Sequence, residues 1–188
     1  MHNTFPNKFY FINSFKKNNI DKLNINTGVI FRNYSKKVSI YEIIQTKKYC
    51  KKKGIKFFLS NNIKLSIKLG LDGSYIPSFN QSLRHLAYKT KSSFIIMGSA
   101  HNIREIEFKI KQGCENILLS KLFKVEYKPN SSYFGLIRFN IFSNFSKRII
   151  PLGGINSSNF NNLKNLKSEG VAILSEIKKK PAIASRLF

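Results

Sequence analysis

This sequence of 188 residues is poor in acidic side chains, which number nine against 33 lysines and arginines, for a formal net charge of +24. Only two of the acids, Asp21 and Asp72, are aspartates. Because a dedicated Mg²⁺ site needs carboxylate oxygens, such a site is poorly supplied. The basic residues are scattered and form no long block, so we interpret them as a general coating of the surface, with nucleic-acid binding as the less favoured alternative. The positive field would still steer phosphorylated metabolites inward.

Cysteine is scarce, and long apolar runs are lacking. Cys50 and Cys114 are far apart, fall in different predicted helices and have no CxxC pair or histidine cluster beside them. We therefore expect neither a disulfide nor a zinc site, and a reducing cytoplasm as the location. No apolar run approaches the roughly 20 residues of a membrane span, and the N-terminus lacks an export signal pattern. We expect a cytoplasmic protein without a membrane partner.

Short apolar runs alternate along the chain with segments of helical spacing. The predicted strands cover 8–13, 28–32, 55–59, 74–76, 94–97, 117–119, 149–152 and 171–174. This alternation predicts an all-parallel α/β fold in one domain, residues 1–188, with 1–7 as a frayed lead-in. Eight such units favour a closed (β/α)₈ TIM barrel, which must be compact, with short first and last helices, since about 250 residues are usual. An open doubly wound sheet is the alternative, but no G-x-G-x-x-G turn follows the first strand.

The stretch 149–175 has the pattern strand, glycine turn, helix, strand. Gly153 and Gly154 end the first strand, Leu163 and Leu166 mark the helix, and the second strand ends at Leu174 and Ser175. Glycine backbone N–H groups and a helix N-terminus can bind an anion, and barrels hold phosphate at the loops after the seventh and eighth strands. The alternative is that the glycines only form a tight turn.

Active side chains of a barrel stand at the carboxyl ends of its strands. Here these ends carry cations, hydroxyls and amides but no carboxylate, a set that suits phosphate or pyrophosphate. His101 is the only histidine on such a loop. Its role is either that of a general acid/base or that of a cap of the next helix. His85 is expected on a helix surface. The residues at these ends are Arg32, Asn33, Tyr34, Ser60, Asn61, Asn62, Ser78, Asn80, Ser99, His101, Lys128, Gly153, Gly154, Leu174 and Ser175.

Six segments resemble, in order, the motifs of one known family. VIFRNY at 29–34 is similar to VQLREK, and LSNNIKLSIKLGLDGSYI at 59–76 to INDR…LALGADGVHL. Residues 97–101 resemble a GxSxH turn, and KLFKVEYKPN at 121–130 resembles PVFPTxTKPG. Residues 153–155 and 170–175 match GGI and GVAVIS. On these motifs the chain is identified as a divergent member of the thiamine-phosphate synthase / TenI family, which implies a (β/α)₈ barrel that handles the pyrimidine and thiazole phosphates of thiamine synthesis.

The resemblance implies a role for each matching residue. Arg32, Ser99 and Lys128 would hold the pyrophosphate of the pyrimidine substrate, with Ser60 also at a substrate-binding position. The thiazole phosphate would be held by Gly153, Gly154 and the turn formed by Leu174 and Ser175. In the synthase reaction pyrophosphate leaves and the thiazole nitrogen attacks the pyrimidine methyl cation, so cations on the leaving group would stabilise the transition state.

The chain departs from the family at its metal site. The Asn-Asp pair after strand three is Ser60 and Asn61 here, and the acidic position after strand four is Asn80. An amide oxygen can ligate Mg²⁺ but supplies no charge, so we expect metal-assisted departure of pyrophosphate to suffer badly. Ile30 and Tyr34 also replace the Gln and Lys of the strand-two motif.

TenI-type members also lack the metal aspartate, and their ProSer pair after strand four is similar to Pro77 and Ser78. Their acid/base histidine lies after strand six, where this chain has Lys121. The expected function is therefore synthase-like coupling of hydroxymethylpyrimidine pyrophosphate with thiazole phosphate, with impaired activity. The alternatives are a TenI-like isomerase, with His101 or Lys121 as the proton carrier, and a non-catalytic binder of a phosphorylated ligand. The sequence predicts no oligomeric state.

Overall fold

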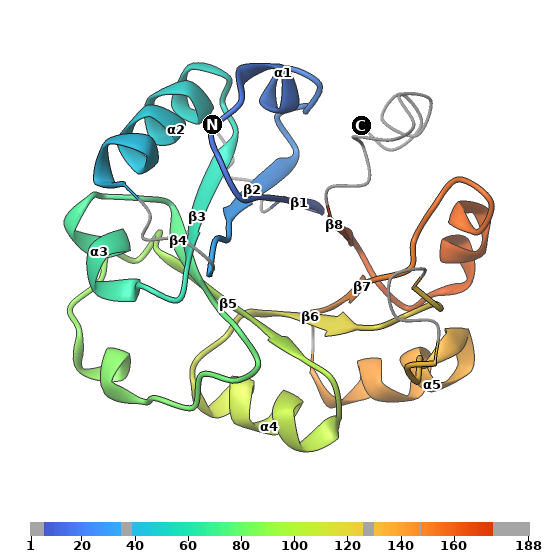
Figure 1. Ribbon diagram of the computed structural model, residues 1–188. Coiled ribbons are helices and arrows are strands. Elements are labelled where there is room, and N and C mark those ends of the chain that lie inside the picture. Colours follow the sequence, from blue (N-terminus) through green and yellow to red (C-terminus); the bar gives the residue numbers. More distant parts are fainter. Residues whose placement is uncertain (1–5, 35–38, 126–129, 147, 175–188) are drawn as a thin grey trace.

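Figure 1 shows the computed structural model of the chain, in which eight strands stand around a common axis with helices outside them. The structure describes residues 6–34, 39–125, 130–146 and 148–174. The strands are β1 (Lys8–Ile12), β2 (Thr27–Phe31), β3 (Lys56–Ser60), β4 (Gly73–Ile76), β5 (Ile95–Ala100), β6 (Asn116–Ser120), β7 (Ile149–Leu152) and β8 (Val171–Leu174). Between them lie α1 (Lys17–Ile20), α2 (Ile40–Lys52), α3 (Ile63–Lys68), η1 (Arg84–Ala87), α4 (Ile103–Lys111), α5 (Gly135–Phe142), η2 (Ser143–Phe145) and η3 (Phe160–Asn165).

The strands form one closed barrel in sequence order. β1 closes the ring, because Lys8 is in register with Thr27 of β2 on one side and with Val171 of β8 on the other. Every neighbouring pair is parallel, so all strands end at the same mouth. The predicted (β/α)₈ barrel is confirmed, and the open sheet is excluded.

β5 is longer than the sequence pattern indicated. It continues to Ala100, so Gly98 and Ser99 belong to the strand and not to the turn after it. Gly98 is needed there because a Cβ atom would lie 2.8 Å from Cδ of Lys109 and 2.9 Å from Sγ of Cys114. The extension places Ser99 on a rigid element.

The helical connections differ from expectation at three places. The helices predicted from Leu83 and Leu86 and from Leu163 and Leu166 are the short 3₁₀ turns η1 and η3. Two leucines three residues apart fit a 3₁₀ turn as well as an α-helix. α5 was not expected, since its sequence GLIRFNIF is apolar on most sides and shows no stripe. The first helix is a single turn, as expected, and the predicted last one lies outside the described residues. None of the helices in the described ranges is long and apolar enough to cross a membrane.

Side chains alternate between the barrel interior and the surface that faces the helices. The interior cluster includes Ile30, Phe58, Met97 and Leu118, all buried. One further step of the same alternation places an inward side chain at the mouth on each of these strands or just after it. These side chains are polar, namely Arg32, Ser60, Ser99 and Ser120. The apolar interior therefore ends in a polar layer at the carboxyl ends of the strands.

Both cysteines belong to the packed part of the protein. Cys50 in α2 and Cys114 after α4 are buried, free thiols. Burial raises the pKa of each thiol to about 12. Neither thiol is therefore ionised at neutral pH.

Candidate functional site

Arg32 and Ser99 meet around the side chain of Tyr75 at the mouth of the barrel. The backbone N–H of Arg32 donates to the carbonyl oxygen of Ile12 at 2.7 Å, which fixes the residue between β1 and β2. Tyr75 on β4 is 2% exposed, and burial raises its pKa to about 12, although hydrogen bonds with Ser99 and Arg32 oppose the shift. Two candidate residues from different strands thus share one partner. Tyr75 itself was not singled out from the sequence, where it reads as strand core.

The guanidinium of Arg32 lies over two aromatic rings. Its Cζ atom is 4.7 Å from the ring centroid of Phe11 and 6.0 Å from that of Tyr34. The ring faces attract the cation and hold it in place, and the N–H groups at the edge of a guanidinium match the oxygens of a phosphoryl group. Arg32 is therefore an oriented cation at the mouth.

Two exposed rings form the rim beside Arg32. Tyr34 is 52% exposed and Phe79 is 63% exposed, and their centroids are 5.5 Å apart in an edge-to-face contact. The hydroxyl groups of Tyr34 and Ser60 share a hydrogen bond of 2.8 Å. Partial burial raises the pKa of Tyr34, opposed by Ser60 and by the charge of Arg32. Ser60 thus positions Tyr34, and Phe79 is a rim residue that the sequence interpretation did not include.

Asn61 and Asn80, the positions of the expected metal ligands, bind each other. Nδ2 of Asn80 donates to Oδ1 of Asn61 at 2.7 Å, and Oδ1 of Asn80 accepts from the backbone N–H of Ser82 at 2.8 Å. Both amide oxygens are therefore engaged, and neither carries charge. No group of three or more His, Cys, Asp or Glu side chains that could hold a metal occurs among the described residues. This donor set does not fit Mg²⁺, which takes carboxylate oxygens.

A buried lysine holds the loop that carries Asn80. Nζ of Lys109 donates to the carbonyl oxygens of Pro77 and Asn80, both at 2.9 Å, and to Oε1 of Gln112 at 2.7 Å. Lys109 is 1% exposed, and burial lowers its pKa. His85, expected on a helix surface, is buried instead, and its Nε2 lies 2.8 Å from the carbonyl oxygen of Gln112. These contacts tie the loop after β4 to α4.

The Gly153–Gly154 turn packs closely against the segment after β6. Both glycines have positive φ angles, 91° and 70°. A Cβ atom on Gly154 would overlap the backbone of Phe123 and Lys124, and one on Gly153 would lie 3.2 Å from Oγ of Ser120. The element after this turn is the 3₁₀ turn η3 and not the expected α-helix. The prediction that a helix dipole contributes to an anion site here was therefore wrong. The turn provides close backbone approach alone.

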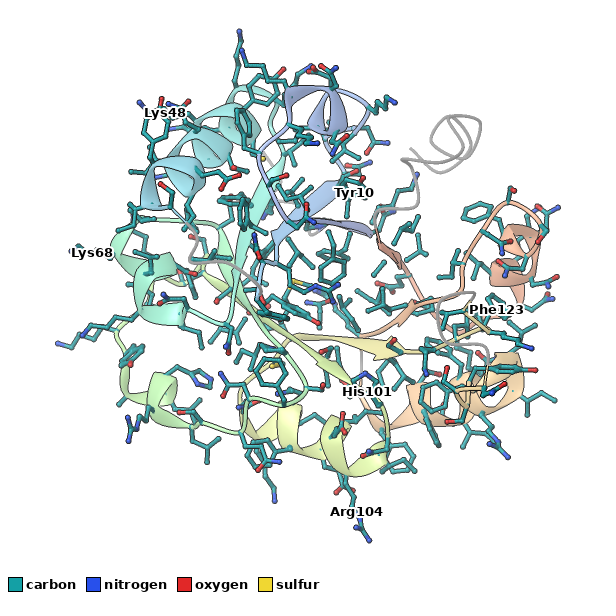
Figure 2. All side chains as sticks on the ribbon, in the orientation of Figure 1. Tyr10, Lys48, Lys68, His101, Arg104 and Phe123 are labelled. Carbon is teal, nitrogen blue, oxygen red and sulfur yellow. The ribbon has the colours of Figure 1, made fainter. Side chains whose placement is uncertain are left out.

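His101 is held by a carboxylate at the start of α4. Oε2 of Glu105 accepts from the backbone N–H of His101 at 2.8 Å and lies 3.1 Å from its Nδ1, so in the neutral ring Nδ1 carries the proton and Nε2 the lone pair. Figure 2 places His101 between α4 and α5. A cavity of about 220 Å³ there is lined by His101, Ser120, Lys121, Ser132, Tyr133, Phe134 and Arg138. Asn102, and not His101, caps α4, through a hydrogen bond of 2.9 Å from the N–H of Glu105.

The structure brings the remaining predicted residues together only in part. Arg32, Ser60 and Ser99 lie in the polar layer at the mouth, whereas His101 lies in the neighbouring cavity beside α5. Lys128 and Ser175 lie outside the described residues, and of Leu174 only the backbone position at the end of β8 is described. The proposed roles of these three residues remain predictions.

Comparison with known proteins identifies the family. Residues 24–177 match the sequence profile of the family described as thiamine monophosphate synthase. Thiamine-phosphate synthase of Prochlorococcus marinus subsp. pastoris is 27% identical over 146 residues, which are 77% of this chain and 42% of that protein. The enzyme of Geobacillus thermodenitrificans is 23% identical over 140 residues, 73% of this chain and 63% of that protein. The chain thus spans less than two thirds of the length of these relatives.

Solved structures share the fold at low sequence identity. Thiamine phosphate pyrophosphorylase from Pyrococcus furiosus superimposes with a TM-score of 0.74 at 16% identity, covering 95% of this chain and 91% of that one. N-(5′-phosphoribosyl)anthranilate isomerase from Pyrococcus furiosus gives a TM-score of 0.68 at 16% identity, covering 98% and 96%. These similarities support the barrel architecture.

Proposed function

Because this chain belongs to the thiamine monophosphate synthase family, we propose that it binds phosphorylated precursors of thiamine at the mouth of its barrel. The proposed reaction couples hydroxymethylpyrimidine pyrophosphate with thiazole phosphate to give thiamine phosphate and pyrophosphate. The observation that carries the proposal is the cluster of Arg32, Tyr75 and Ser99, which joins an oriented guanidinium and a hydroxyl at the carboxyl ends of the strands. Lys128 is assigned to the same site on the family resemblance.

The geometry suits stabilisation of a leaving group. In the proposed transfer the bond between the pyrimidine methylene carbon and a pyrophosphate oxygen breaks, and pyrophosphate takes the electron pair. The thiazole nitrogen then donates its pair to the same carbon. Negative charge on the departing oxygen grows toward the transition state, so a fixed Arg32 binds the transition state more tightly than the substrate. Since burial raises its pKa to about 12, Tyr75 keeps its proton and acts as a fixed hydroxyl that positions Arg32 and Ser99.

We propose that the thiazole phosphate is held at Gly153 and Gly154, with the turn after β8. Positive φ angles and the absence of Cβ atoms let the backbone of this turn come close to a ligand, as it does to Phe123. No step is assigned to Mg²⁺, because the oxygens of Asn61 and Asn80 are engaged in internal hydrogen bonds. Coupling without a metal is expected to be slow relative to that of family members with both carboxylates.

A TenI-like isomerase is the second candidate, and one observation favours it. In the neutral ring of His101 the lone pair is on Nε2, because Glu105 faces Nδ1, and His101 lines a cavity together with Lys121. A base and a cation in one cavity could move a proton between two positions of a thiazole ring. In this alternative His101→Gln would abolish turnover while binding of thiazole phosphate persists.

The test is to incubate the purified protein with both phosphorylated precursors and measure thiamine phosphate by chromatography. Formation that is lost in Arg32→Ala and kept in His101→Gln supports the synthase reaction. Conversion of the thiazole phosphate alone, lost in His101→Gln, supports the isomerase. If calorimetry shows that neither precursor binds, the proposed function is wrong.

A further inference from the structure

A second basic cavity lies beside the Asn61–Asn80 pair. It has a volume of about 190 Å³ and lies between the start of α3 and η1. Its polar lining comes from Asn61, Asn62, Lys64, Asn80, Ser82, Arg84, His85 and Tyr88, and none of its lining residues is a carboxylate. The charged groups at this cavity are therefore both positive.

Hydrogen bonds fix which way the three lining amides point. The N–H of Leu65 donates to Oδ1 of Asn62 at 3.1 Å, and the N–H of Ser82 donates to Oδ1 of Asn80. Only an oxygen can accept from a backbone N–H, so the nitrogen of Asn80 faces Asn61, which must present its own oxygen in return. Each of the three oxygens therefore already accepts one hydrogen bond, and Asn61 and Asn62 also carry amide N–H donors.

Hydrogen bonds hold the two backbone segments that carry the cations Lys64 and Arg84. Lys64 is in the first turn of α3, whose N-cap is Asn62, and Arg84 begins η1. Nε2 of Gln112 donates to the carbonyl oxygen of Ser82 at 2.9 Å, which secures the chain just before Arg84. In the described part of the chain, neither the ion pair of Lys53 with Asp21 nor the contact of His101 with Glu105 includes one of these two cations.

We infer that this cavity is a phosphoryl-binding subsite in which Lys64 and Arg84 supply the positive charge that a metal ion would otherwise bring. Donors and cations without a carboxylate select an oxyanion and disfavour a divalent cation. The inference rests on the proposed function for the identity of its ligand, the far phosphoryl group of the pyrimidine diphosphate. Free pyrophosphate has the same chemistry and is the probe.

The experiment is calorimetric titration of inorganic pyrophosphate in the presence of EDTA. We expect binding to the unaltered protein and an affinity weaker by roughly tenfold or more in Lys64→Ala/Arg84→Ala, since each change removes a charge-assisted hydrogen bond. Lys68→Ala is the matched control: it lies on the same helix, points to the outer edge in Figure 2 and does not line the cavity, so its affinity should be unchanged. The conservative variant Lys64→Arg/Arg84→Lys should retain most of the affinity.

Equal affinity in the double alanine variant would overturn the subsite, as would binding that appears only when Mg²⁺ is added. The proposed function is judged separately, by titrating thiazole phosphate and the pyrimidine diphosphate into Arg32→Ala. If Arg32→Ala weakens binding and Lys64→Ala/Arg84→Ala does not, the subsite is wrong and the proposed function stands. If the unaltered protein binds neither pyrophosphate nor the precursors, both fail.

Discussion

The side chain of Asn80 donates a hydrogen bond of 2.7 Å to the side chain of Asn61, across the gap between the ends of β3 and β4. Asn61 adopts a positive φ angle of 59°, and its backbone N–H bonds to the carbonyl oxygen of Tyr75 at 2.8 Å, so both backbone and side chain are held. Asparagine tolerates this conformation better than most residues do. Two neutral amides, hydrogen-bonded to each other, therefore occupy the positions at which the family resemblance implies charged metal ligands.

Restoring the carboxylates should restore metal binding. In Asn61→Asp/Asn80→Asp two like charges would face each other, which raises the pKa of one carboxyl unless a cation intervenes. We expect Mg²⁺ to bind this variant and to raise its melting temperature, with little effect on the unaltered protein. Calorimetry and thermal unfolding with and without Mg²⁺ provide the measurement. Asn62→Asp is the control, and comparable Mg²⁺ binding by the unaltered protein would contradict the role assigned to the pair.

Binding of the pyrimidine diphosphate should depend on the shape of the Arg32 side chain as well as on its charge. Arg32→Lys keeps the positive charge but loses the planar fork and the stacking on Phe11 and Tyr34. We expect the affinity for the pyrimidine diphosphate to fall roughly tenfold in Arg32→Lys and further in Arg32→Ala. Arg104→Ala, whose side chain projects outward from α4 in Figure 2, is the control for a general loss of charge. If lysine substitutes fully, the stacked geometry has no role in binding.

A matched pair of glycine variants separates backbone strain from steric overlap. Gly135 and Gly154 have similar φ angles, 68° and 70°, but a Cβ atom on Gly135 would have nothing within 4 Å. Gly135→Ala should therefore cost only the conformational term, about 1–2 kcal/mol of unfolding free energy. Gly154→Ala should cost more and also weaken binding of thiazole phosphate, because the segment at Phe123 must move. Equal losses in denaturant unfolding would show that the turn accommodates the methyl group.

The buried thiols make stability depend on alkaline pH. Burial raises the pKa of Cys50 and of Cys114 from 9.0 to about 12 in the folded protein. Above pH 9 the unfolded chain loses these protons while the folded one keeps them, so the stabilisation is present below pH 9 and is lost as the pH rises toward 12. Each thiol should lower the unfolding free energy by about 1.4 kcal/mol per pH unit in that range.

Cys50→Ala/Cys114→Ala should show a flatter pH dependence than the unaltered protein, even though it is less stable at neutral pH. Urea unfolding at several pH values between neutral and strongly alkaline gives both curves. A thiol reagent supplies an independent check, because buried neutral thiols should react only after unfolding. Parallel curves for the two proteins would mean that the thiols are not the titrating groups.

The barrel was predictable because its strands are short apolar runs at regular intervals. Periodicity could not identify the kind of turn around Leu86 or Leu163, where tertiary packing selects 3₁₀ geometry. It also missed α5, which lacks an amphipathic stripe, and it placed on a helix surface His85, which is buried beside the carbonyl oxygen of Gln112. The spacing of apolar residues therefore located the strands. The contacts between the elements could be identified only from the three-dimensional structure of the closed barrel.

The sequence could predict those residues of the candidate site whose position depends on a single strand. Arg32 and Ser99 were expected at one mouth because each comes at or just after the carboxyl end of a parallel strand, although Ser99 lies within β5 and not in the turn after it. Tyr75 resembles core residues in sequence, and only its contacts with Arg32 and Ser99 show that it belongs to the mouth. The cavity with Lys64 and Arg84 depends on two connections that meet in space, which no single segment indicates.

The three hydrogen bonds of Lys109 have a consequence for how a ligand would associate. They anchor the connection after β4 when the protein folds, before any ligand arrives. A preorganised connection loses little conformational entropy on association, so a ligand docking beside Asn80 would meet a rigid receptor. Buried Lys109 thus preorganises the part of the barrel mouth next to β4 for ligand binding.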